Sequence, residues 1–281
     1  MQTPPDLFDR SLLALRRARA VGFGDKGNFL HLEVADQVSE RLQEVNKTFR
    51  DAAVVGPKAG LWIETIGFPG FSPAADQETL NLAESSLDLV IHGMALHWAN
   101  DPVGQLVQMR RALKPDGLML AVMFGGQTLH ELRTALAEAE AEIEGGLSPR
   151  IAPMGEIRDL GGLIQRAGLA LPVADSVKLN VTYQTPLHLM QDLRAMGETN
   201  VMYARRKVPM RRKTLLRAME IYSENYTGPD GRINATFEIV FLTGWAPSET
   251  QQKPLRPGSA KARLADALGI PEINAGEKAK R

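Results

Sequence analysis

Side chains capable of chemistry gather at residues 94–106, MALHWANDPVGQL, where an apolar run stops at His97 and Trp98. An imidazole at the end of a buried strand could line the substrate side of a cleft and accept a proton. The structural alternative is that Trp98 fills the corner between strand and helix while His97 bonds a backbone carbonyl. We interpret His97 and Trp98 first as residues that fill the corner between strand and helix, and only second as part of the wall of a site.

Composition limits which other chemistries are open. The 281 residues contain no cysteine, which excludes disulfides, zinc–thiolate sites and thiol nucleophiles. His92 and His97 have no third ligand nearby in the sequence, so we expect no metal site. Lysine and arginine together number 33, as do aspartate and glutamate, and this balance argues against a nucleic-acid partner.

The elements that must position these residues alternate between strand-like and helix-like segments. This alternation predicts an α/β fold with a mostly parallel sheet and helices on both faces. Strands are expected at 52–56, 61–67, 87–96, 117–126, 177–184 and 235–245, and helices at 6–22, 29–46, 102–113, 128–144, 159–169, 186–197 and 211–226. Ligands of such folds bind at the carboxyl ends of the strands, here after Gly56, around Asp76, after Ile91 and after Phe124.

Turn and cap residues mark where several helices begin. Asn100 or Asp101 is expected to cap a helix whose first position is Pro102. Thr128 and Glu131 have the spacing of a capping box. Just before them, Gly125–Gly126 either lets a substrate approach the strand end or only makes the turn.

We predict one domain over residues 1–245, with a helical lead-in at 1–50 and a helical elaboration at about 186–228, followed by a Pro/Lys-rich tail at 246–281. The Arg-rich start resembles a transit peptide, but its two aspartates favour a first helix of the fold. Because no apolar run approaches the ~20 residues of a membrane span, we expect a soluble, cytoplasmic protein with at most peripheral contact to the inner membrane.

Two sets of motifs resemble known families. The stretch from AADQETL to VMFGG, with an acid, SSLDLV, LHW and LKPDG in order, looks like the second half of a class I S-adenosylmethionine-dependent methyltransferase domain. Downstream, LMQDLRAMGETN and ATFEIVFLTGW are similar to the methyltransferase-like assembly factors of respiratory complex I, relatives of the biotin-pathway carboxyl methyltransferases. This second match begins at FDRSLLALRRARA and covers nearly the whole chain.

The resemblance implies a Rossmann-like fold, S-adenosylmethionine as cofactor and the following roles. Cofactor-binding residues would be Gly56, Asp76, Gln77, His92 and Gly93, and substrate-binding residues Trp98, Phe124 and Gly125. His97 and Glu198 are the catalytic candidates, and Glu198, the acid of MGETN (196–200), could grip a guanidinium.

The chain departs from the methyltransferase pattern in its cofactor half. Only Gly56 stands where a glycine-rich turn is expected, and Pro57 after it has no N–H to donate. About 20 residues separate Gly56 from Asp76, too few for the helix, strand, second helix and third strand that normally intervene. Glu64 could be the acid that holds the ribose, but it lies too close to Gly56 for a crossover helix. We therefore predict a shortened N-terminal half.

Three functions follow as hypotheses. The first is a complex I assembly protein that modifies an arginine of a client subunit, by hydroxylation rather than methyl transfer. The second is a non-catalytic scaffold that holds the client, and the third is an ordinary small-molecule or carboxyl methyltransferase. A basic cluster at 205–217 would dock an acidic client face or an anionic membrane, or is only a solvated helix face.

Overall fold

Six strands form one sheet in the order β2-β1-β3-β4-β6-β5 in the computed structural model, which describes residues 6–251, 266 and 269. The strands β1 (Ala52–Val55), β2 (Phe71–Ala74), β3 (Leu87–Gly93) and β4 (Leu113–Phe124) pair in parallel. Strand β6 (Ile233–Trp245) pairs antiparallel with both β4 and β5 (Ala170–Tyr183), so it alone runs against the other five. The predicted α/β, mostly parallel, Rossmann-like architecture is confirmed.

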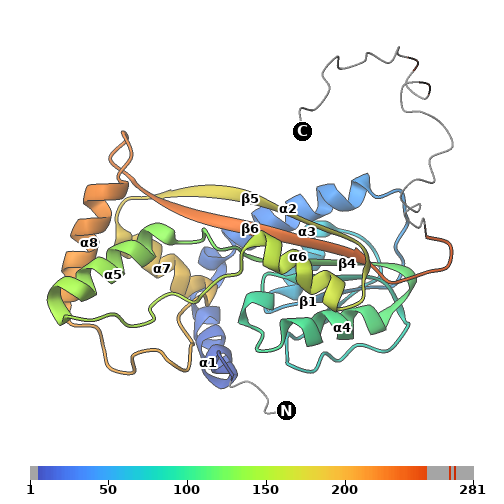
Figure 1. Cartoon of the computed structure of the whole chain (residues 1–281), viewed down its shortest axis with the longest axis horizontal. Helices are drawn as coiled ribbons and strands as arrows, with labels where there is room; N and C mark the ends of the chain where they lie inside the picture. Colours follow the sequence, from blue (N-terminus) through green and yellow to red (C-terminus); the bar gives the residue numbers. More distant parts are fainter. Residues whose placement is uncertain (1–5, 252–265, 267–268, 270–281) are drawn as a thin grey trace, which may run out of the picture. The chain divides into compact units, whose positions relative to one another are not determined.

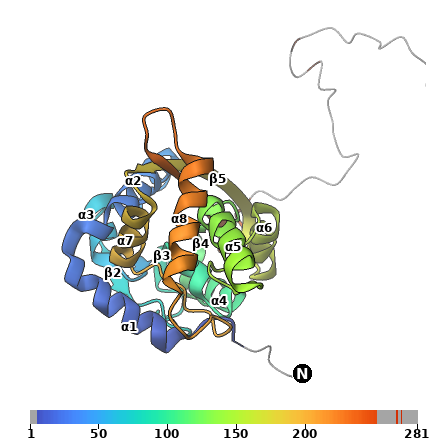
Figure 2. The same cartoon turned by 90° about the vertical axis from the view of Figure 1, so that its left-hand side faces the viewer.

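Helices cover both faces of the sheet because alternate strand residues point to opposite sides. One face packs against α2 (Phe29–Glu44), α3 (Ala59–Ile66), α5 (His130–Glu144), α7 (Pro186–Met196) and α8 (Arg212–Tyr226). The other face packs against α4 (Pro102–Ala112) and α6 (Ile157–Arg166). Figure 1 shows α5, α7 and α8 gathered at one end, and Figure 2 faces that end, with α8 between α5 and α7.

The N-terminal segment is a helix of the fold, as predicted. In α1 (Arg10–Ala20), Asp9 is the N-cap and its Oδ1 accepts a hydrogen bond from the Leu12 N–H at 2.9 Å. A 3-10 segment, η1 (Val21–Gly27), then leads into α2. Contacts between residues divide the chain into Met1–Ser248 and Glu249–Arg281. Most of the predicted tail lies outside the described residues, and the domain limits stay a prediction.

The strand predicted at 61–67 is wrong, because these residues form most of α3. Ala59, Trp62 and Ile66 recur at helical spacing and are buried against the sheet, and Gly67 ends the helix with a left-handed φ of 72°. Since α3 is itself the crossover from β1 to β2, Glu64 lies on the helix that its position was thought to exclude. The strand that precedes Asp76 therefore lies directly beside β1.

The capping box predicted at Thr128 and Glu131 is also wrong. The Thr128 hydroxyl donates to the Glu238 carbonyl at 3.1 Å and accepts from the Glu238 N–H at 3.1 Å, while Glu131 Oε1 accepts from the Thr236 hydroxyl at 2.5 Å. Both side chains thus form hydrogen bonds with residues of β6 and do not cap α5. Asp101 is the cap of α4, accepting from the Gly104 N–H at 2.7 Å.

Within the part of the chain that the structure describes, no helix combines the length and the apolar character needed to cross a bilayer.

Candidate functional site

Asp76 follows β2 at the carboxyl edge of the sheet and is held by two arginines of α1. Arg17 Nη1 donates to both carboxylate oxygens, at 2.9 and 2.8 Å, and Arg10 donates to the Asp76 carbonyl and approaches its carboxylate at 3.4 Å. The Asp76 side chain is only 9% exposed. A buried carboxylate needs such partners, because desolvation of an unpaired charge is costly.

A cavity of about 460 Å³ lies beside this ion pair. Its walls come from α1 and from the ends of β1 and β2. The lining residues are Arg10, Leu13, Ala14, Arg17, Ala18, Val21, Pro57, Asp76, Gln77 and Glu78. This volume is within the range of small-molecule sites. The second terminal nitrogen of Arg17, Nη2, is buried and has no hydrogen-bond partner.

Gly56 and Gly93 bring the ends of β1 and β3 close together. A Cβ on Gly56 would lie 2.8 Å from the Gly93 carbonyl oxygen, and a Cβ on Gly93 would lie 3.0 Å from the Trp62 ring. Trp62 Nε1 in turn donates to His31 Nδ1 at 3.0 Å, and both side chains are buried. The two predicted glycines therefore serve close packing under α3 in this structure.

His92 lies in the core and lines none of the cavities described here. Its Nε2 is 2.9 Å from Gln105 Oε1, and the Gln105 amide donates to the Gln77 carbonyl at 3.1 Å. Burial lowers the pKa of His92 to about 4, so the ring is neutral near pH 7. By way of its contact with Gln105, His92 thus supports the loop that carries Asp76 and Gln77.

His97 and Glu198, the two catalytic candidates, meet across 101 residues of chain. His97 Nε2 lies 3.1 Å from Glu198 Oε2, and Trp98 Nε1 donates to the same oxygen at 2.7 Å. Trp98 also packs edge-on against Phe8 at the corner. The corner interpretation holds for Trp98, but the partner of His97 is a carboxylate and not the backbone carbonyl considered from the sequence.

Glu198 is a buried and ionised acid. Burial raises the pKa of Glu198, but the charge and hydrogen bond of His97, the charge of Arg17 and the Trp98 hydrogen bond outweigh it and hold that pKa below its usual value. Among the described residues, none donates to the other oxygen, Oε1. A further cationic group could therefore pair with this carboxylate.

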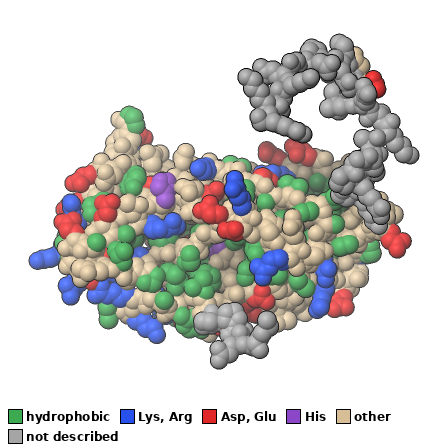
Figure 3. Space-filling view, in the orientation of Figure 1, with side chains coloured by type: hydrophobic (Ala, Val, Ile, Leu, Met, Phe, Trp, Pro, Cys, Tyr) green, Lys and Arg blue, Asp and Glu red, His purple; other side chains and the backbone are tan. Residues whose placement is uncertain are grey.

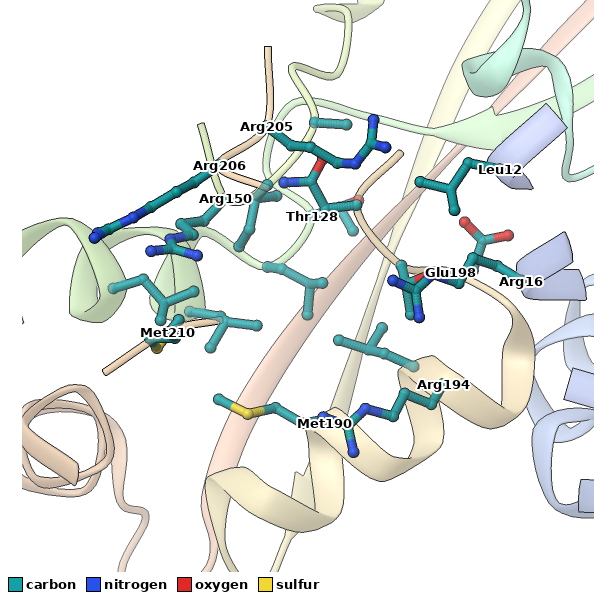
Figure 4. A pocket seen from close by; sticks show the side chains of 18 of the residues that line it. Leu12, Arg16, Thr128, Arg150, Met190, Arg194, Glu198, Arg205, Arg206 and Met210 are labelled. Atoms are coloured by element: carbon teal, nitrogen blue, oxygen red, sulfur yellow. The ribbon is translucent and has the colours of Figure 1, made fainter. Parts of the chain in front are cut away.

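Glu198 lines a pocket of about 650 Å³ with an apolar interior (Figure 4). Its apolar walls come from β4, α5, α7 and β6, and include Phe124, Leu132, Met190 and Phe237. Figure 4 shows Leu12, Arg16 and Glu198 on one side, Arg150, Arg205 and Arg206 on the opposite side, and Met190 and Arg194 below. Glu198 is the only acid among the lining residues, against five arginines and Lys207.

The predicted substrate-side residues differ in their access to this pocket. Trp98 and Phe124 line it, and the Phe124 ring lies 4.8 Å from that of His97. Gly125 does not line it, and a Cβ on Gly125 would lie 2.6 Å from the Glu238 carboxylate. A Cβ on Gly126 would lie 2.4 Å from Glu156. Because side chains already fill the space beside Gly125 and Gly126, these glycines are better explained by the turn than by an approaching substrate.

The arginines of α1 were missed as site residues. The run RRAR was interpreted only as part of a first helix, yet it carries Arg16 and Arg17, one in each cavity. Helical periodicity could have placed these neighbours on different faces of the helix. It could not have named Asp76, 59 residues away from Arg17, as a partner.

The basic cluster 205–217 is partly neutralised. Arg205 pairs with Asp9 at 3.3 Å, Arg206 pairs with Glu144, and Arg217 pairs with Glu142 at 2.8 Å. Its four remaining cations are exposed: Lys207, Arg211, Arg212 and Lys213. Figure 3 shows Lys and Arg side chains gathered at the lower left, near the end where α5 and α8 lie.

Comparison with known proteins found a matching family model and similar solved structures. A family model described as a methyltransferase domain matches residues 68–121. A solved structure of a putative type II methyltransferase from Anaeromyxobacter dehalogenans superposes with a TM-score of 0.49 at 16% identity, over 75% of this chain and 96% of that one. The strand order and the family model define a protein of the class I methyltransferase fold.

The chain belongs to the arginine-hydroxylase NDUFAF5 family. It is 35% identical over 294 residues to "Arginine-hydroxylase NDUFAF5, mitochondrial" of Danio rerio, covering 95% of this chain and 91% of that protein. The Homo sapiens protein of that name is 36% identical over 287 residues, covering 93% and 83%. A malonyl-[acyl-carrier protein] O-methyltransferase of Laribacter hongkongensis is 35% identical over 66% of this chain and 59% of its own length. The family resemblance predicted from the sequence is confirmed.

Proposed function

We propose that this protein acts in the assembly of respiratory complex I and modifies an arginine of a client subunit. The observation that carries the proposal is the ionised Glu198 carboxylate in the wall of the 650 Å³ pocket, fixed by His97 and Trp98 with Oε1 free to accept. Carboxylates bind guanidinium groups through strong charge-assisted hydrogen bonds. The name arginine-hydroxylase of the relatives supports hydroxylation as the modification. This step replaces a C–H hydrogen by a hydroxyl group, so it needs an external two-electron oxidant such as dioxygen with a reductant, which a sulfonium methyl group does not supply.

We propose S-adenosylmethionine as the cofactor, in the 460 Å³ cavity beside Asp76. The residues fit in kind: Asp76 offers acceptors for hydroxyl or amino groups, and the unpartnered N–H of Arg17 suits a carboxylate. Gly56, Gln77 and Gly93 would form the backbone around it. When bound, the cofactor supplies a methyl group on a positively charged sulfonium.

The test is genetic. Deleting the gene should lower the yield of assembled complex I. Glu198→Gln should fail to restore it, because losing a charge-assisted bond costs about 1.5–3 kcal/mol, or roughly 10–100-fold in client affinity. Glu142→Gln, an exposed acid outside both cavities, is the control and should restore assembly. Normal complex I in the deletion strain would refute the proposal.

The pairing of Asp76 with Arg10 and Arg17 favours a second candidate, a client-binding scaffold without catalysis. Titrating the purified protein with S-adenosylmethionine in a calorimeter separates the two. Micromolar binding supports an enzyme, whereas client binding without any cofactor heat supports the scaffold.

The third hypothesis, an ordinary small-molecule or carboxyl methyltransferase, draws support from the malonyl-[acyl-carrier protein] O-methyltransferases. It depends most on the missing glycine turn, and transfer of a labelled methyl group to a small acceptor would favour it.

The client and the cellular location follow from the same proposal. The exposed cations of cluster 205–217 would dock an acidic face of the client or the anionic surface of the inner membrane. We place the protein in the cytoplasm or at the periphery of that membrane. The relatives' names place those proteins in mitochondria.

A further inference from the structure

The 650 Å³ pocket combines a negative wall with a positive mouth. Three of its cations, Arg16, Arg194 and Lys207, are exposed and have no ion-pair or hydrogen-bond partner among the described residues. They come from three separate elements: α1, α7 and the segment between α7 and α8. Figure 4 shows Arg16 and Arg194 reaching toward the pocket from different sides.

The other cations of the pocket are already paired. Arg150 pairs with the buried Glu140, Arg206 with Glu144, and Arg205 donates to the Met202 carbonyl at 2.8 Å. Unpaired like charges that converge on one opening repel each other unless an anion comes between them. The three free cations therefore form a site that suits negative groups, around a pocket whose own acid suits a positive one.

We propose that the client motif is an arginine flanked by acidic residues, with the guanidinium at Glu198 and the flanking carboxylates at Arg16, Arg194 and Lys207. This inference rests on the proposed function and adds the residues that select the client. An arginine with neutral or basic neighbours would have to bring its charge past the cationic mouth without compensation. The acidic neighbours remove that repulsion and add exposed ion pairs.

The test is direct binding of short peptides to the whole protein, measured by fluorescence anisotropy at low salt. Three peptides share one sequence with a central arginine and differ only in having aspartate, asparagine or lysine on both sides of it. A fourth carries citrulline between the aspartates. We expect the Asp-flanked arginine peptide to bind about tenfold more tightly than the Asn-flanked one, with the preference shrinking as salt increases.

The decisive variant is Arg16→Gln/Arg194→Gln/Lys207→Gln. It should bind Asp-flanked and Asn-flanked peptides equally, because removing the three cations weakens binding of the Asp-flanked peptide and relieves the repulsion of the Asn-flanked one. The matched control, Arg19→Gln/Arg166→Gln/Lys178→Gln, removes three exposed cations outside both cavities and outside cluster 205–217, and it should keep the preference.

Two failures can be told apart. Equal affinity for Asp- and Asn-flanked arginine peptides, or loss of the preference in the control variant, overturns this inference alone. Equal affinity for arginine and citrulline peptides overturns the proposed role of Glu198 itself.

Discussion

At the scale of single residues, the site depends on two buried carboxylates with different partners. Asp76 is paired with arginines of the first helix, whereas Glu198 is hydrogen-bonded to an imidazole and an indole that follow β3. Arg17 influences both, because it bonds Asp76 and its charge lowers the pKa of Glu198. The two cavities are therefore electrostatically connected through one side chain.

Breaking the Arg17–Asp76 pair should destabilise the fold. Arg17→Ala leaves the Asp76 carboxylate, 9% exposed, with only Arg10 nearby, so we expect a loss of about 3 kcal/mol in the free energy of unfolding. The double variant Arg17→Ala/Asp76→Asn should lose less than the two single changes added together. Urea unfolding measures each value, with the exposed Arg19→Ala as control. Equal effects of Arg17→Ala and Arg19→Ala would contradict a structural ion pair.

At the scale of elements, α1 is a wall shared by both cavities. Leu12 and Arg16 line the 650 Å³ pocket, while Leu13 and Arg17 line the 460 Å³ cavity. Its far end is positioned by η1, which approaches the end of α7 closely. A Cβ on Gly27 would lie 2.3 Å from the Ala195 carbonyl oxygen.

This close approach predicts a contrast between two glycines of η1. Gly27→Ala should cost about 1–3 kcal/mol of stability, because the rigid backbone of α7 must move. Gly22→Ala meets no atom within 4 Å and should be close to neutral. Thermal unfolding of both variants checks the contrast, and similar midpoints for the two would show that η1 does not pack on α7 as described.

At the scale of the whole molecule, two neutral histidines are built into the core. Burial lowers the pKa of His31 and of His92 to about 4, and His31 accepts the Trp62 hydrogen bond only while Nδ1 is unprotonated. In the unfolded chain both histidines bind protons near their ordinary pKa of about 6.5. Protons therefore favour the unfolded state at acid pH.

Because folding lowers the pKa values of both histidines, the free energy of unfolding depends on pH. Above pH 6.5 both contributions are fully present, and they are lost as pH falls from about 6.5 toward 4. Between pH 7 and 5.5 each histidine should reduce the free energy of unfolding by about 1 kcal/mol. His92→Gln should flatten this dependence, whereas the exposed His188→Gln should leave it unchanged. Urea titrations at the two pH values decide, and an unaltered slope in His92→Gln would contradict the assignment.

The sequence alone determined the order of most helices and strands, the family, and Trp98 as a corner residue, because these depend on local periodicity and short motifs. It misassigned 61–67, where a short helix with few polar positions has the composition of a buried strand. It also placed Thr128 and Glu131 in a local cap. Only the tertiary structure decided that they bond β6, that Arg17 pairs with Asp76, and that Glu198 meets His97. Those contacts join residues 59 to about 110 positions apart, and their energies depend on burial and sheet order, which local patterns do not encode.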